Sequence, residues 1–279
     1  MFTIEEIEES KEITKEAKDW ARDNLAYLNK PLKTLFSQSV KTRKGSQDYE
    51  VHVMYLQPAD KVAVKTLCSF ADKAGCKKPC LISSGHLGMT PAQNACTKRT
   101  IYFLLRPELF ERMLSAEIEK LDIASAMAGK KALFRLNGTS DVDWSSVIES
   151  KEHIDFYDYS KEIGRIGRNK LGNYDLTFSA SMFSDQSISA FKKAMKRGYR
   201  IAVAFNTKEA KKDNLRIPKE LESFDKDDLR PVNGLGIVGT LSRKGSSVSE
   251  RLKEDKKASS FFVTSANIKE FNNIIAIGA

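Results

Sequence analysis

The stretch Ala132-Leu-Phe-Arg-Leu-Asn137 is a short run that is apolar in the middle and polar where it ends. Three further runs of the same kind follow it along the chain, at 154–160, 174–179 and 199–205. Helical or basic segments separate these runs, most clearly a helical one at 187–197. Strands that alternate with helical segments in this way predict a mostly parallel sheet.

Two more runs of this type flank the first four, at 49–56 and at 236–241, and bring the predicted strands to six. Six strand–crossover units favour an incomplete (β/α) barrel, and a doubly wound open sheet is the alternative fold. In both folds the ligand site lies at the carboxyl ends of the strands. We therefore expect the polar residues that end these strands to meet at one edge of the sheet.

Helices are predicted before and between these strands. Residues 3–28 carry an apolar stripe, with Thr3 and Glu6 spaced as in a capping box, and we expect one amphipathic helix there. Two further helices are expected to begin near Pro91 and Pro107, because proline is favoured in the first turn of a helix.

We expect one α/β domain over residues 1–279, with 1–48 as an N-terminal helical extension. The segment 208–234 is polar, charged and poor in apolar residues. A segment of that composition and length favours a surface loop, and we expect it to form a flap over the site.

The composition limits the classes of partner. The chain has 279 residues, of which 41% are hydrophobic and 30% charged, and its net charge is +9. A basic balance of this size indicates an anionic partner, such as nucleic acid, a nucleotide or another polar anionic small molecule. The acidic first residues are unlike a secretory signal, and no apolar run reaches the length of a membrane span. We expect a cytoplasmic protein without a membrane partner.

Three of the four cysteines, Cys68, Cys76 and Cys80, lie within thirteen residues. In a reducing compartment, clustered cysteines indicate metal ligands before structural disulfides. Three thiolates would hold three irons of a four-iron iron–sulfur cluster and leave the fourth iron open. A zinc site would need a fourth ligand, Cys96 or His86. Unliganded thiols or one disulfide are the remaining interpretation.

The polar ends of the strands supply the other candidate residues. Asp141 and Asp158 are the candidates for acid–base catalysis, and Lys161 joins them as a catalytic candidate that can also bind an anion. Each of them could equally be an ordinary loop residue or a helix cap. Five further polar residues are expected to bind a cofactor or ligand at the same edge: Asn137, Ser140, Ser160, Ser179 and Arg243.

Several blocks of the chain resemble the phage gene product eighty-eight family, which has no established activity. The resemblance covers residues 51–263, and its most specific block is Arg135-Leu-Asn-Gly-Thr-Ser-Asp141. Further blocks are Cys68 through Arg99, 156–161, 173–179, 201–205, 228–230 and 238–245. Membership would imply a phage protein that works in the cytoplasm of an infected host.

More distantly, the cysteine loop and the incomplete barrel resemble radical S-adenosylmethionine (SAM) enzymes. That resemblance implies SAM as a cofactor and a radical-SAM-like reaction, although the spacing of Cys68, Cys76 and Cys80 is longer than is usual in those enzymes. The segment 137–141 stands where a glycine-rich SAM-binding segment would be expected. The alternative hypothesis is a non-catalytic phage protein that binds nucleic acid or a host protein and holds zinc or no metal.

Overall fold

The computed structural model describes residues 1–38, 48–206, 221–226, 229–232, 235–243 and 256–277. The described strands form one eight-stranded sheet with the order β1-β2-β3-β4-β5-β6-β8-β7. Their bounds are β1 Phe36–Ser37, β2 Tyr49–Met54, β3 Lys131–Arg135, β4 Asp155–Ser160, β5 Tyr174–Ala180, β6 Ile201–Phe205, β7 Glu222–Ser223 and β8 Val238–Ser242. Only β1 is antiparallel to its neighbour, and the other pairs are parallel.

The sheet confirms the predicted fold class. All six predicted strands are present as β2, β3, β4, β5, β6 and β8, and the two added strands are two-residue edges. The sheet is open, and its order from β1 to β6 follows the chain without the reversal that a doubly wound sheet requires. This succession of neighbouring parallel strands is the arrangement expected of an incomplete barrel.

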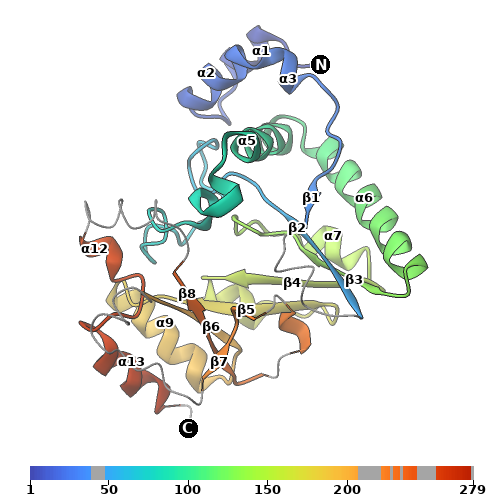
Figure 1. Cartoon of the computed structure of the whole chain (residues 1–279). Coiled ribbons are helices and arrows are strands. Elements are labelled where there is room, and N and C mark those ends of the chain that lie inside the picture. Colours follow the sequence, from blue (N-terminus) through green and yellow to red (C-terminus); the bar gives the residue numbers. More distant parts are fainter. Residues whose placement is uncertain (39–47, 207–220, 227–228, 233–234, 244–255, 278–279) are drawn as a thin grey trace.

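Helices pack on one face of the sheet in two cores. The described helices are α1 Ile4–Glu9, α2 Lys15–Asp23, α3 Leu25–Leu28, α5 Thr90–Leu105, α6 Pro107–Met127, α7 Ser145–Glu149, α8 Ile163–Arg168, α9 Asp185–Lys196, α12 Lys256–Ser259 and α13 Ile268–Ile275. In the first core, Phe134 and Phe156 of the sheet pack with Phe110 of α6. In the second, Phe178 packs with Phe191 of α9; Figure 1 shows α6 and α9 beside the sheet. Alternation along each strand therefore assigns every second side chain to this helical face.

The prediction of a single helix over residues 3–28 was wrong. The chain forms α1, α2 and α3, because the segment after α1 bonds to a distant strand-like segment instead of continuing the helix. Ile13 forms an antiparallel bridge with Ala63, and the Thr14 side chain then caps α2. The predicted Thr3 cap of α1 is confirmed. The three helices lie against α5 (Figure 1).

The structure describes only part of the segment 208–234, for which a flap was predicted. Residues 207–220, 227–228 and 233–234 lie outside the described part of the chain. Within the described part, β7 joins the edge of the sheet by pairing with β8, and Phe224 is fully buried. Since most of the segment lies outside the described residues, a flap over 208–234 stays a prediction.

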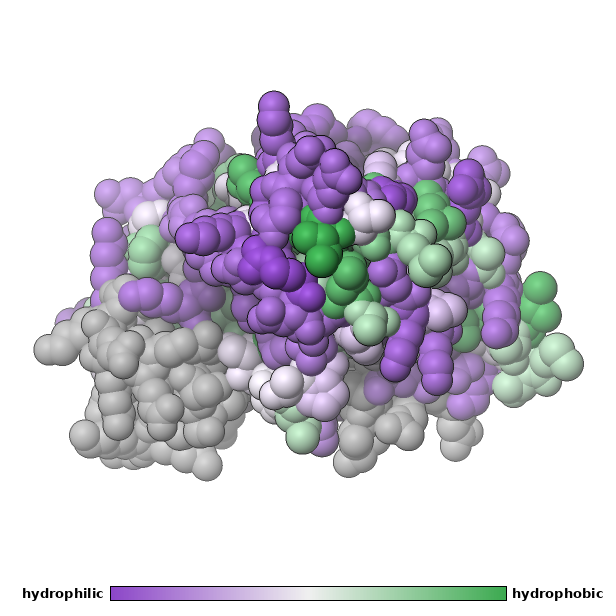
Figure 2. All heavy atoms as spheres, turned by 90° about the horizontal axis from the view of Figure 1, so that it is seen from above, coloured by the Kyte–Doolittle hydropathy of each residue, from purple (hydrophilic) through white to green (hydrophobic). Residues whose placement is uncertain are grey.

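Hydrophilic residues dominate the described part of the face shown in Figure 2, and apolar residues gather there only in small areas. Among the helices of the described residues, none combines the length and apolar character needed to cross a membrane.

Candidate functional site

A cavity of about 370 Å³ lies at the carboxyl ends of the parallel strands. Its floor consists of side chains from the face of the sheet that is turned away from the helices. The strand residues of that face that line it include Arg135, Tyr159, Ser179, Ala202, Ala204 and Leu241. These positions alternate with the residues of the helical cores, because successive side chains of a strand point to opposite faces. The predicted location of the site at this edge thus coincides with a real cavity.

All three clustered cysteines line this cavity. Cys68, Cys76 and Cys80 come from the loop between β2 and α5, and each is a half-buried free thiol. The Cys68 thiol donates to the Thr139 carbonyl at 3.7 Å, and the Cys76 thiol donates to the Ala71 carbonyl at 3.7 Å. Burial raises the pKa of Cys68 to about 12 and also raises the pKa of Cys76. Without a metal, both groups are therefore protonated thiols at neutral pH.

The thiols share the cavity without converging on one point. In the described part of the chain, no group of three or more His, Cys, Asp and Glu side chains is arranged so that it could hold a metal ion. Cys96 and His86, the two predicted candidates for a fourth ligand, are not among the residues that line the cavity. Cys96 is buried on α5, where Arg99 lies beside it, and His86 lies in the short 3₁₀ helix Gly85–Gly88.

The cysteine loop is fixed to the segment between β5 and α9. Ser181 Oγ donates to the Ala74 carbonyl at 2.7 Å, and Ser184 Oγ and Ser187 Oγ donate to the Lys73 carbonyl at 2.8 and 2.9 Å. These contacts satisfy two backbone carbonyls that a tight loop would otherwise leave without helix or sheet partners. They hold the backbone between Cys68 and Cys76 in place.

Asp141 lines the cavity and is held on two sides. Its Oδ1 accepts from Arg165 Nη1 at 2.6 Å, and its Oδ2 accepts from Ser160 Oγ at 3.0 Å. Burial raises the pKa of Asp141, and the charge of Arg165 opposes that rise. The predicted site residue Ser160 therefore supports Asp141, and it does not line the cavity itself.

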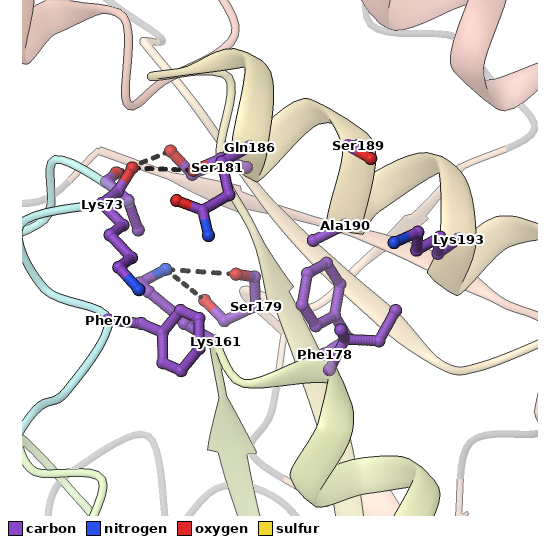
Figure 3. A pocket seen from close by; sticks show the side chains of 13 residues that line it. Phe70, Lys73, Lys161, Phe178, Ser179, Ser181, Gln186, Ser189, Ala190 and Lys193 are labelled. Atoms are coloured by element: carbon purple, nitrogen blue, oxygen red, sulfur yellow. Dashed lines mark hydrogen bonds between the residues drawn. The ribbon is translucent and has the colours of Figure 1, made fainter.

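Lys161 places a cation at the edge of the same cavity. Its Nζ donates to Ser179 Oγ at 2.9 Å and to the Ser179 carbonyl at 3.2 Å, and it lies 4.6 Å from the centre of the Phe261 ring. Burial lowers the pKa of Lys161, while the charge of Asp141 opposes that change. The predicted pair Lys161 and Ser179 is thus brought together, as Figure 3 shows.

Asp158 points to the other face of the sheet, away from the cavity. Its Oδ1 accepts from the Asn137 backbone N–H at 2.8 Å, and its Oδ2 accepts from the Tyr174 hydroxyl at 3.0 Å. Burial raises the pKa of Asp158 to about 6. Asn137 in turn accepts from Ser140 Oγ at 2.9 Å. Asp158 therefore positions the turn after β3, and only Asn137 and Ser140 of this group line the cavity.

The sequence analysis missed the four aromatic residues that line the cavity: Phe70, Tyr159, Phe261 and Phe262. Tyr159 covers Arg135, whose guanidinium carbon lies 4.6 Å from the ring centre. Phe70, Phe261 and Phe262 come from segments outside the parallel strands. Strand alternation could have found Tyr159, which is two residues before Lys161, whereas nothing local marks the other three. The predicted Arg243 does line the cavity, at the end of β8.

The model of the family described as Gene product 88 matches residues 21–263. The chain belongs to this family. The match confirms the phage family that the sequence blocks indicated, and it extends over both the cysteine loop and the strand ends of the site. No curated protein and no solved structure matches the chain significantly. None of these comparisons supports the resemblance to radical SAM enzymes, which stays a prediction.

Proposed function

We propose that this Gene product 88 protein holds an iron–sulfur cluster on Cys68, Cys76 and Cys80 and binds a polar, anionic small molecule beside it. One observation carries the proposal: three thiols from one loop line the same cavity as Asp141 and Lys161. A concave site with a few polar groups is the usual form of a small-molecule site. The cavity combines such groups with a set of soft ligands.

The donor set fits a cluster better than a single ion. Thiolates are the ligands of iron–sulfur clusters, and a cluster spans the distance between ligands that do not meet at one point. Bound through three thiolates, a four-iron cluster leaves one iron open to a ligand. The thiols must lose their protons to bind. Lys161 favours that loss, because its charge opposes the rise that burial gives the pKa of Cys76, and the same charge would balance an anionic cluster.

The remaining groups of the cavity suit a polar ligand. Asp141 can accept from an amino or hydroxyl group, while Lys161 and Arg243 can bind a carboxylate or phosphate. The aromatic ring of Phe261 offers an apolar surface next to them. SAM carries both an amino and a carboxylate group, and it is the first ligand to test because the sequence resemblance predicted it.

Anaerobic purification with analysis of iron, acid-labile sulfide and zinc tests the cluster. We expect a coloured protein with iron and sulfide, and loss of both in Cys68→Ala, Cys76→Ala and Cys80→Ala. Cys96→Ala is the matched control, since that thiol lies away from the cavity, and it should keep the cluster. A colourless protein that contains zinc or no metal, even after anaerobic reconstitution, would remove the proposal and favour the nucleic-acid or host-protein binder.

Binding of the small molecule is tested separately. Titration calorimetry of the reconstituted protein with SAM should give saturable binding that weakens about tenfold in Asp141→Asn, if one charge-assisted contact is lost. Ser146→Ala is the control, because Ser146 is exposed on α7 and does not line the cavity, and it should leave the affinity unchanged. Equal affinity in Asp141→Asn would remove Asp141 from the ligand site.

A further inference from the structure

A second cavity, of about 220 Å³, adjoins the larger cavity that Cys68, Cys76 and Cys80 line, which we call the cysteine cavity. It lies between the cysteine loop, the end of β5 and the first turns of α9, and Figure 3 shows it from close by. Phe70, Lys161 and Ser179 line both cavities, so the two spaces meet at these residues. The proposed cluster and its ligand do not account for this second space.

The second cavity is lined by cations and neutral hydrogen-bonding groups. Three lysines face it, Lys73, Lys161 and Lys193, and none of the described residues that line it is acidic. In Figure 3 the side chains of Lys73, Lys161 and Gln186 point into one common space, and Lys193 lies at its other end. A small space with surplus positive charge attracts an anion.

Two of these lysines contact neutral groups. The Lys161 ammonium donates to two oxygens of Ser179. The Lys73 ammonium lies 5.1 Å from the centre of the Phe70 ring, and its backbone carbonyl is fixed by Ser184 and Ser187. A buried ammonium that contacts neutral groups is stabilised by an oxyanion beside it. The loop and α9 thus hold the lysines in place for a ligand that supplies the counter-charge.

We infer that this second cavity is an oxyanion subsite, which takes the phosphate or carboxylate end of a small molecule. The amide of Gln186 and the hydroxyl of Ser179 can donate to the oxyanion alongside the ammonium groups. The rest of the ligand extends past Lys161 into the cysteine cavity. This last step rests on the function proposed above, whereas the affinity of the second cavity for an oxyanion does not.

The test uses the full chain, purified in air, and inorganic phosphate as the probe. Calorimetric titration at constant ionic strength should show saturable binding to the wild-type protein. Lys73→Gln and Lys193→Gln should each weaken it about tenfold, because each removes one charge-assisted contact. Lys192→Gln is the matched control, since Lys192 pairs with Glu270 and does not line the cavity. Acetate as a second probe distinguishes a phosphate site from a carboxylate site.

Two results would overturn the inference: neither probe binds saturably, or Lys192→Gln weakens binding as much as Lys193→Gln does. Cys80→Ala separates this inference from the proposed function. That variant cannot form the cluster, yet it should bind phosphate with unchanged affinity. Loss of phosphate binding in well-folded Cys80→Ala would contradict an independent oxyanion subsite, whatever the metal analysis shows.

Discussion

Replacing Gly75 by alanine should dislodge the cysteine loop. Gly75 has a φ of 66°, in the left-handed region that residues with a Cβ rarely adopt. An added Cβ would also come within 2.7 Å of Phe183 Cε2 and closer still to two other carbons of that ring. The residue stands directly before Cys76, so both effects act on the part of the loop that carries the thiols.

The two effects can be given magnitudes. The left-handed conformation costs a residue with a Cβ about 1–2 kcal/mol, and overpacking against a fixed ring costs about 1–3 kcal/mol. Together, Gly75→Ala should cost about 2–5 kcal/mol. Gly85 is the matched control in the same region, because its φ is 55° and an added Cβ would meet nothing within 4 Å. Gly85→Ala should therefore cost only the conformational part, about 1–2 kcal/mol.

The substitution can lower the free energy of unfolding or detach the loop, and one assay detects each of these effects. Urea unfolding reports a lower free energy of unfolding if the loop stays in place. Titration with a thiol reagent reports faster reaction of Cys76 if the loop detaches from Ser181 and Ser184. Phe183→Ala in the Gly75→Ala background should recover the packing part of the loss. Equal losses of unfolding free energy in Gly75→Ala and Gly85→Ala, with equal reactivity of Cys76, would refute the close packing of the loop.

Two further predictions concern the buried charges beneath the site. The pKa of Asp158 is raised from 3.8 to about 6. Its contribution to the free energy of unfolding is therefore full below pH 3.8, and about 3 kcal/mol of it in total is lost as the pH rises through 6. The free energy of unfolding of the wild type should fall relative to Asp158→Asn between pH 5 and 7.5, by roughly half of that amount, and parallel pH profiles would contradict this. Arg165→Met should cost about 3–5 kcal/mol in urea unfolding, because it leaves the buried carboxylate of Asp141 without its cation. Arg168→Met breaks an ion pair in which Arg168 is 72% exposed and should cost at most about 1 kcal/mol, so similar losses in the two variants would count against the buried pair.

The strands could be predicted from the sequence because each is a local feature. A run such as 132–137 is bounded by polar residues and pairs with neighbours of the same kind, so its own composition suffices to identify it. The prediction of one N-terminal helix failed for the opposite reason. Ile13 bonds to Ala63, fifty residues away in the sequence, and no local pattern records that contact.

The face to which a strand residue points is harder to predict than the strand itself. Residues 156–159 read Phe-Tyr-Asp-Tyr, with large or polar side chains on both faces, so hydropathy does not show which face is the helical one. Packing of Phe156 against α6 decides it, and that choice sends Asp158 under the helices and Tyr159 into the cavity. Asp158 and Tyr159 are neighbours in the sequence, yet the first has a structural role under the helices and the second lines the cavity.

Lys161 links the two proposals, because it faces both cavities and carries a charge that each of them uses. Toward the cysteine cavity it opposes the rise that burial gives the pKa of Cys76, and toward the second cavity it would pair with an oxyanion. Anions on the two sides share one cation, so each reduces the attraction that Lys161 offers to the other. The geometry therefore favours a neutral or cationic centre in the part of a ligand that lies over the cysteines, with its negative charge confined to the far end, between Lys73 and Lys193. A molecule with that division of charge satisfies every group of the two cavities, whereas one that is anionic throughout would compete with the thiolates for Lys161.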